Sequence, residues 1–84
     1  MKDVPLNLKN TLRSLRVKLG YTQAEAANLL GITPPTLRSW EKDSTAIKWT
    51  NVERIEAVYH TPRDYIFFGE EVSFSERAKK TYVS

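Results

Sequence analysis

The sequence predicts an all-α protein built as one small domain. Apolar residues recur at intervals of three and four along most of the chain, and residues that commonly cap helices precede these stretches. No stretch alternates between apolar and polar residues as a half-buried strand does. With 84 residues, the chain has room for one small core and a tail, and none for a second ligand-sensing or catalytic domain. We expect a five-helix bundle over residues 8–69, an N-terminal arm over 1–7 and a C-terminal extension over 70–84.

The first helix is predicted from a stripe of leucines. Leu8, Leu12, Leu15 and Leu19 fall on one face of an α-helix, and Gly20 provides a natural end because glycine readily adopts the left-handed conformation. Basic side chains lie largely off this stripe.

Capping residues predict the second and third helices. Thr22 and Glu25 have the spacing of a capping box, and the helix that they open ends at Gly31. Thr33 is a good N-cap and Pro34 suits the first helical position, where its missing N–H costs nothing. The third helix therefore runs from Pro34 to about Lys42.

The same reasoning predicts two more helices. Thr50 and Glu53 form a second capping-box pattern, and Thr61 followed by Pro62 starts a fifth helix that ends at Gly69. In the extension, an apolar spacing predicts a short helix capped by Ser73, although a flexible tail stays open. The residues of that spacing are Phe74, Ala78 and Tyr82.

Three aromatic side chains and one histidine have expected roles of their own. Trp49 either covers the edge of the core or faces a partner, and His60 is expected in a turn. Phe67 and Phe68 supply more aromatic surface than one short helix can bury. We expect either a dimer contact or a tail that folds back over them.

The composition argues against most kinds of chemistry. The chain has no cysteine and one histidine, so disulfides, thiolate zinc sites and cysteine nucleophiles are excluded. We expect no enzymatic activity, no cofactor and no metal. No apolar run approaches the roughly 20 residues that span a bilayer, and the N-terminus lacks a secretory pattern. We therefore expect a soluble, cytoplasmic protein with no membrane partner.

Positive charge is concentrated in the first part of the chain. The net charge is +3, and residues 1–50 carry eight Lys and Arg against four acids, whereas residues 51–84 carry five against six. This distribution favours one face that meets a polyanion. Ordinary solvated surface charge is the alternative.

Residues 23–40 have the pattern of a helix-turn-helix. Ala27 allows the second and third helices to cross closely, and Gly31 allows a tight turn between them. Apolar residues, Leu37 and Trp40 among them, attach both helices to the first. The third helix then projects from the body and can enter a major groove of DNA.

A longer compound motif resembles a known family. The segments RVKLGYTQAEAA (16–27), LGIT (30–33) and LRSWE (37–41) resemble the Xre family of phage and bacterial transcriptional regulators, which have a lambda-repressor-like or Cro-like DNA-binding domain. The resemblance covers about residues 8–69. It implies sequence-specific binding of double-stranded DNA, with the helix at about 34–42 in the major groove.

The resemblance also implies roles for individual residues. Arg16 and Glu41 are expected to form a structural ion pair, with Ala27, Gly31, Leu37 and Trp40 as further structural residues. The expected base contacts are Pro34, Pro35, Thr36, Arg38, Ser39 and Lys42. The expected phosphate contacts are Thr22, Gln23, Thr33, Lys9, Lys48 and Asn51. A helix N-terminus favours phosphate at Gln23 because its N–H groups are free, while simple capping is the alternative for Thr22 and Gln23.

Three positions depart from the family pattern. Pro34 and Pro35 stand where polar residues are common, so readout is expected to rest more on Arg38, Ser39 and Lys42. Asp43 stands where glycine is frequent, so the third helix is expected to end differently.

The expected partners follow from the size of the domain. One module buries little surface, so we expect a homodimer, at least on DNA, that binds half-sites of an inverted-repeat operator about one helical turn apart. The alternative is a protein-interaction module, antirepressor-like or antitoxin-like, that uses the helix-turn-helix surface to bind another regulator.

Overall fold

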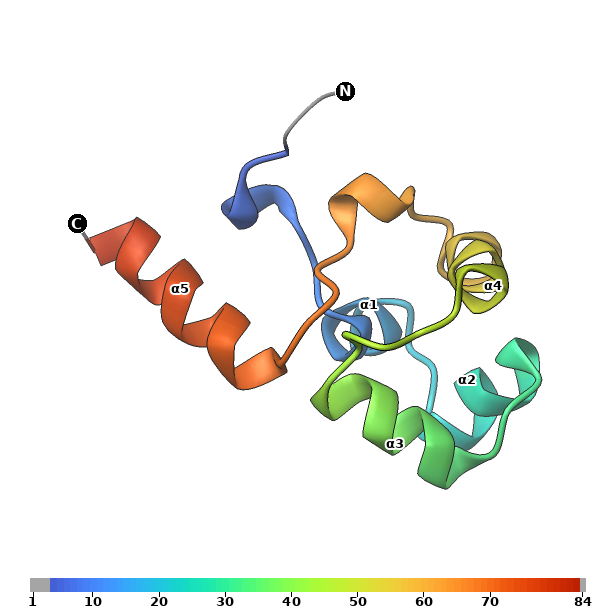
Figure 1. Ribbon diagram of the computed structural model, residues 1–84. Coiled ribbons are helices and arrows are strands. Elements are labelled where there is room, and N and C mark those ends of the chain that lie inside the picture. Colours follow the sequence, from blue (N-terminus) through green and yellow to red (C-terminus); the bar gives the residue numbers. More distant parts are fainter. Residues whose placement is uncertain (1–3, 84) are drawn as a thin grey trace.

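Five α-helices and two short 3₁₀ helices make up the described part of the chain (Figure 1). The structure, a computed structural model, describes residues 4–83, and for residues 78 and 80–83 it describes only the course of the backbone. The elements are η1 (Leu6–Leu8), α1 (Leu12–Lys18), α2 (Gln23–Leu30), α3 (Pro34–Lys42), α4 (Trp49–Tyr59), η2 (Arg63–Tyr65) and α5 (Glu71–Val83). Within residues 4–83 there is no strand, and the all-α class predicted from sequence is confirmed.

The first helix is shorter than the leucine stripe predicts. Leu12 and Leu15 are buried, but Leu8 belongs to η1 and Leu19 follows α1, and their side chains are 54% and 40% exposed. The cause is a long-range pairing: the N–H of Asn10 donates to the carbonyl of Tyr65, and the Asn10 carbonyl accepts from the N–H of Phe67, both at 2.8 Å. Since the backbone of Asn10 is used in this pairing, α1 begins only after it.

Local capping determines α2 and α3 as predicted. The side chain of Thr22 accepts from the N–H of Glu25 at 3.1 Å, while Glu25 accepts from the N–H of Thr22 at 2.8 Å, which completes a capping box. Gly31 ends α2 with φ +73°. Thr33 caps α3, whose first residue is Pro34.

The capping predicted for the fourth helix is wrong. The helix α4 begins at Trp49 with Lys48 as N-cap, and no side chain caps it. The carbonyl of Lys48 accepts from the N–H groups of both Asn51 and Val52. These bonds place Thr50 inside the first turn of α4, where it cannot be the N-cap. His60 ends α4 in the left-handed region with φ +52°, which confirms that it is a turn residue.

The fifth helix predicted at residues 61–69 is also wrong. Only the 3₁₀ turn η2 forms there, and Thr61 donates its hydroxyl to the carbonyl of Tyr59 and caps no helix. Ile66 is extended because the backbone on either side of it pairs with Asn10. The non-local pairing thus outweighs the local helix signals.

The C-terminal extension forms the fifth α-helix. Its helix α5 begins at Glu71, two residues before the predicted Ser73 cap, and it folds back so that Phe74 packs on Phe67 with ring centroids 4.9 Å apart. Of the two alternatives for Phe67 and Phe68, the folded-back tail is the one observed. The side chains of Ala78 and Tyr82 lie outside the described residues.

One core holds the first four helices and η2 together. Figure 1 shows α1 in the middle, with α2 and α3 below and to the right of it and α4 above α2. Nine buried residues form a continuous apolar cluster, and partly buried side chains such as Trp40, Ile47 and Phe68 pack on it. The members are Leu12, Leu15, Ala26, Ala27, Leu30, Leu37, Ile55, Tyr59 and Ile66. This core leaves the outer face of α3 exposed.

Candidate nucleic-acid interface

The outer face of α3 is polar and basic. Leu37 and Glu41 point inward and are buried, whereas Arg38, Ser39 and Lys42 are exposed. Arg38 and Lys42 are four residues apart, so they lie on the same row of the helix. Neither has an ion-pair partner among the described side chains. An exposed helix with two such cations is suited to a negatively charged partner.

The first turn of α3 has few hydrogen-bonding groups available for a partner. Pro34 and Pro35 are exposed and offer no N–H group. The hydroxyls of Thr33 and Thr36 lie 2.9 Å apart, and the oxygen of Thr33 also accepts from the N–H of Thr36 at 3.4 Å. Any contact from these four residues is therefore an apolar contact or a single hydroxyl bond.

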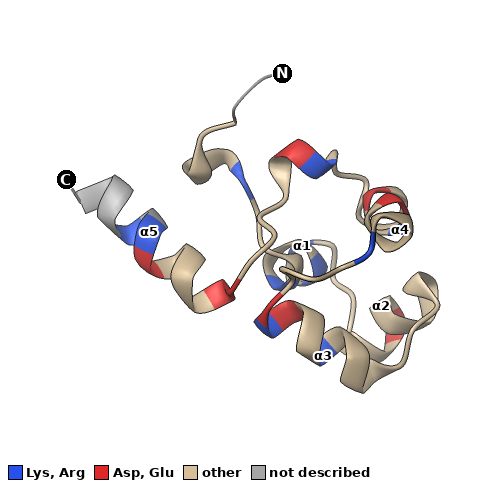
Figure 2. Ribbon diagram, viewed as in Figure 1, with Lys and Arg blue, Asp and Glu red and all other residues tan. Residues whose placement is uncertain are grey.

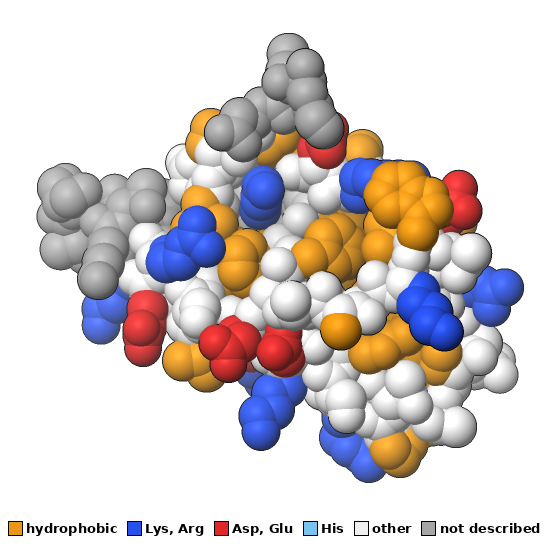
Figure 3. Space-filling view, in the orientation of Figure 1, with side chains coloured by type: hydrophobic (Ala, Val, Ile, Leu, Met, Phe, Trp, Pro, Cys, Tyr) orange, Lys and Arg blue, Asp and Glu red, His pale blue; other side chains and the backbone are white. Residues whose placement is uncertain are grey.

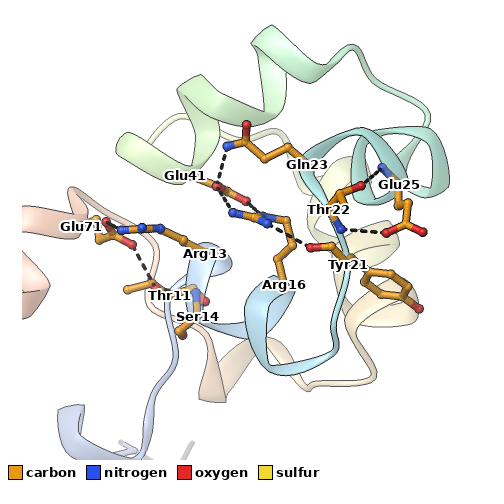
Figure 4. Close-up of polar contacts among 10 residues, drawn as sticks. All are labelled: Thr11, Arg13, Ser14, Arg16, Tyr21, Thr22, Gln23, Glu25, Glu41 and Glu71. Carbon is orange, nitrogen blue, oxygen red and sulfur yellow. Dashed lines mark hydrogen bonds and ion pairs between the residues drawn. The ribbon is translucent and has the colours of Figure 1, made fainter.

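A buried ion pair positions α3 on the rest of the domain (Figure 4). Arg16 of α1 donates through Nε to Glu41 Oε2 at 2.5 Å and through Nη2 to Glu41 Oε1 at 3.3 Å. The Nη1 group donates to the carbonyl of Tyr21 at 3.0 Å. The side chains of Arg16 and Glu41 are only 12% and 5% exposed. The hydrogen bond with Glu41 raises the pKa of Arg16 further above its ordinary value, although burial opposes this.

Gln23 joins the same network. Its side-chain Nε2 donates to Glu41 Oε1 at 3.1 Å, so its side chain is held against α3 (Figure 4). Gln23 is also the first residue of α2, where the backbone N–H has no acceptor within the helix. Thr22 uses its oxygen for capping but keeps a hydroxyl proton to donate. A phosphate role for either residue therefore rests on backbone N–H groups and this hydroxyl.

These elements enclose a shallow hollow beside α3, which we call the basic hollow. Its four cationic side chains come from α1 and α3: Arg13, Arg16, Arg38 and Lys42. Gln23 lines it as well, together with the carboxylates of Glu41 and Glu71. Because Glu41 and Arg16 form an ion pair with each other, three cations (Arg13, Arg38 and Lys42) and one carboxylate (Glu71) are left to face the solvent.

Two of these residues were not predicted as site residues. Arg13 lies three residues before Arg16, and that spacing places both on neighbouring positions of one helix face, which is a signal that the sequence does contain. Glu71 comes from α5 and lies within 3.7 Å of Arg13. No local pattern links residues so far apart in the chain.

The start of α4 forms a second part of the exposed surface. Lys48 is its exposed N-cap, Asn51 is half-buried, and Trp49 is 63% exposed. The guanidinium of Arg63 lies 3.8 Å from the centre of the Trp49 ring, and Glu56 holds Arg63 with two side-chain bonds at 2.7 and 3.0 Å. Hydrogen bonds from Arg63 keep the pKa of Glu56 below its ordinary value. Trp49 thus covers Arg63 and does not enter the core.

Lys9 is the predicted contact that lies apart from the others. It follows η1, and Figure 1 shows η1 on the side of the molecule opposite α3. In Figure 2, basic residues are spread over α1, α3 and the segment that leads into α4. Figure 3 shows acidic side chains gathered where α5 begins, beside the end of α3. The surface charge is therefore mixed at this junction.

The end of α3 differs from a glycine-ended helix, as its sequence predicts. Asp43 has extended backbone with φ −152°, so no left-handed conformation is needed. Its carboxylate accepts from the hydroxyl and the N–H of Thr45 at 2.5 and 3.0 Å, and these bonds lower the pKa of Asp43.

Neither a cluster of metal-ligating side chains nor a membrane-spanning helix is found in the part of the chain that the structure covers. No group of three or more His, Cys, Asp or Glu side chains there is placed to hold a metal ion. No helix in the same residues combines the length and the apolar character that crossing a bilayer requires.

Comparison with known proteins agrees with this geometry. A family model described as Helix-turn-helix matches residues 12–66, from the first residue of α1 to the residue after η2. The chain belongs to the Xre-like helix-turn-helix family. Over 68 residues it is 32% identical to the HTH-type transcriptional regulator ImmR of Bacillus subtilis (strain 168), an alignment that covers 81% of this chain and 54% of that protein. The chain thus spans about half the length of this curated relative. The helices α2 and α3 correspond to the two helices of the helix-turn-helix motif, and residues of both line the basic hollow.

Proposed function

We propose that this protein is a DNA-binding transcriptional regulator that inserts α3 into the major groove. The observation that carries the proposal is the outer face of α3, where Arg38, Ser39 and Lys42 are exposed while Arg16 and Glu41 fix the opposite face. A rigid helix with free donors on one side has the geometry and the chemistry that groove recognition requires. Membership of the Xre-like family and the likeness to a transcriptional regulator support the same function.

Base recognition then rests on three side chains. Arg38 can donate two bonds to the O6 and N7 atoms of a guanine, and Ser39 and Lys42 can donate to base or phosphate oxygens. Pro34 and Pro35 can make apolar contact with a thymine methyl, and the hydroxyl of Thr36 is shared with Thr33. We expect the second half of α3 to contribute more to specificity than its first turn.

Phosphate contacts would flank α3 on both sides. On one side, Thr22 and Gln23 offer a hydroxyl proton and free N–H groups at the start of α2. On the other side, Lys48 and Asn51 lie at the uncapped start of α4, and Thr33 is the N-cap of α3 itself. Lys9 would reach only the outer part of such a surface.

We further propose that the protein acts as a homodimer on an inverted-repeat operator in the cytoplasm of a bacterium, as a repressor of phage or bacterial type. One domain of this size presents one recognition helix, and two-fold symmetry doubles the contact area without a second domain. A bacterial regulator must also work where the chromosome lies, and the similar regulator comes from Bacillus subtilis.

Selection from a random duplex pool tests this function. The protein is mixed with random duplexes at about 150 mM salt, and the retained molecules are sequenced. We expect an inverted repeat with half-sites about one helical turn apart. With Arg38→Ala, the preference at one position of each half-site should relax. If no motif is enriched, direct readout through α3 is wrong, and protein partners become the subject of the search.

A further inference from the structure

The first residue of α5 places a carboxylate in the basic hollow. One oxygen of Glu71 lies 3.7 Å from Nη1 of Arg13, and the other accepts from the hydroxyl of Thr11 at 3.4 Å (Figure 4). Glu71 is the only acidic residue that lines the hollow besides Glu41, among the residues that the structure describes there. Glu41 is already neutralised by Arg16. Among the residues that line the hollow, Glu71 therefore carries the charge that opposes an incoming phosphate.

Several contacts fix the position of Glu71. Ser44, which is buried and lies two residues after α3, donates its N–H to the carbonyl of Gly69 at 3.0 Å, and its Oγ accepts from the N–H of Gly69 at 2.9 Å. Asp43 and Glu70 form a short antiparallel bridge. One turn into α5, Phe74 packs on Phe67. The start of α5 is thus attached to the end of the recognition helix, and Glu71 is held beside the cations.

We propose that Glu71 is a residue of the DNA interface that limits its affinity. The proposal rests on the function proposed above, since it assumes that phosphates approach the basic hollow. Three cations face the solvent there, Arg13, Arg38 and Lys42, so one carboxylate cancels a third of their charge. DNA binding must overcome the repulsion of Glu71 and release Arg13 from it. Through Glu71, the docked α5 helix therefore weakens binding.

The test uses a charge series at this position in the full chain. Binding of a fluorescent mixed-sequence duplex of about 20 base pairs is measured by anisotropy at about 100 mM salt. Glu71→Gln removes the charge with almost no change of shape, and Glu71→Lys reverses it. We expect binding about three- to tenfold tighter for Gln and tighter again for Lys, because one solvated charge near a phosphate contributes roughly that much in a water-like dielectric.

A matched control uses a carboxylate further along the same helix. Glu76 is exposed, does not line the hollow and lies roughly 7.5 Å further along the helix axis. Glu76→Gln and Glu76→Lys should change the affinity less than the matching Glu71 substitutions, because Glu76 is exposed and lies outside the hollow. Circular dichroism of every variant shows whether the helices are retained.

The outcomes separate this proposal from the one on which it rests. If the wild-type protein binds the duplex and the Glu71 variants bind no tighter than the Glu76 variants, the role of Glu71 is overturned and the DNA-binding function stands. If the wild-type protein does not bind duplex DNA, both are overturned. Tightening that is graded from Glu to Gln to Lys at position 71 alone supports the proposal.

Discussion

At the scale of single residues, Glu41 links three helices through hydrogen bonds. It lies on the inner face of α3 and receives bonds from Arg16 and Gln23, so it connects α3 to both α1 and α2. The carboxylate is almost fully buried. A buried ion pair adds little net stability over an apolar pair, but removal of one partner leaves an uncompensated charge.

Glu41→Ala should therefore strongly destabilise the fold. We expect the free energy of unfolding to fall by about 3 kcal/mol, because Arg16 would stay partly buried without its partner. Urea denaturation followed by circular dichroism measures this change. The control is Glu53→Ala, which removes an exposed carboxylate from α4 and should change the stability by less than about 0.5 kcal/mol. Equal effects of the two substitutions would contradict the role assigned to Glu41.

Tyr59 is the second residue with an unusual environment. Its side chain is among the largest that are fully buried, and its hydroxyl has no hydrogen-bond partner among the residues described. Burial, with a smaller contribution from the charge of Glu41, raises the pKa of Tyr59 from 10.0 to about 12. In the unfolded chain the pKa returns to its ordinary value. The hydroxyl of Tyr59 therefore ionises at a lower pH in the unfolded chain than in the folded protein.

This difference predicts a loss of stability in strong base. The contribution of Tyr59 to the free energy of unfolding is fully present below pH 10. It is lost as the pH rises from 10 towards 12, and the free energy of unfolding falls by about 2 kcal/mol at the upper end. Tyr59→Phe should remove this loss and should be neutral or slightly stabilising at pH 7, because an unpaired buried hydroxyl is removed. Urea unfolding of both proteins at pH 9 and pH 11.5 checks the prediction, which fails if the two proteins lose stability in parallel.

At the scale of elements, the sequence predicts structure that depends on neighbouring residues, but not structure that depends on residues far apart in the chain. The caps of α2 and α3 lie within three residues of the groups that they satisfy, so the sequence predicts both helices correctly. The backbone pairing of Asn10 with Tyr65 and Phe67 joins segments that no local pattern connects. That pairing shortens α1 and replaces the predicted fifth helix with a 3₁₀ turn. The errors therefore lie where a long-range contact competes with a local one.

The turn between α2 and α3 makes a prediction about glycine. Gly31 and Gly20 both have positive φ, at +73° and +79°. A Cβ atom at position 31 would lie 2.5 Å from Nη1 of Arg54, which donates to the carbonyl of Leu30 at 3.2 Å, whereas a Cβ at position 20 would meet nothing within 4 Å. The two glycines thus share the backbone strain and differ in their surroundings.

Gly31→Ala should therefore cost more than Gly20→Ala. We expect about 1 kcal/mol for Gly20→Ala, from the left-handed backbone alone. For Gly31→Ala we expect about 1 kcal/mol more, because Arg54 must move away and its hydrogen bond is lost. Thermal unfolding of the two variants compares them directly. A Gly20→Ala variant that is the less stable of the two would contradict this account of the turn.

At the scale of the whole molecule, the basic hollow combines parts of four helices, α1, α2, α3 and α5. The sequence motif indicates the contributions of α2 and α3, because their residues lie within one short segment. The α5 contribution could not be predicted in this way, since Glu71 reaches Thr11 and Arg13 only through the folded chain. Charge counted along the sequence shows that the first 50 residues are basic, but it does not show that an acidic residue from the tail lies among them.

Mapping of the DNA-contacting surface by NMR tests the central claim most directly. A mixed-sequence duplex of about 16 base pairs is added to ¹⁵N-labelled protein at about 50 mM salt, where electrostatic binding to any sequence is favoured. The account predicts the largest changes in the amide signals of residues 22–25, 33, 36–42 and 48–51, and small changes in η1 and η2. Changes confined to η1, η2 and the outer turns of α5, or no change at all, would contradict the claim that α3 and its flanking helix starts bind DNA.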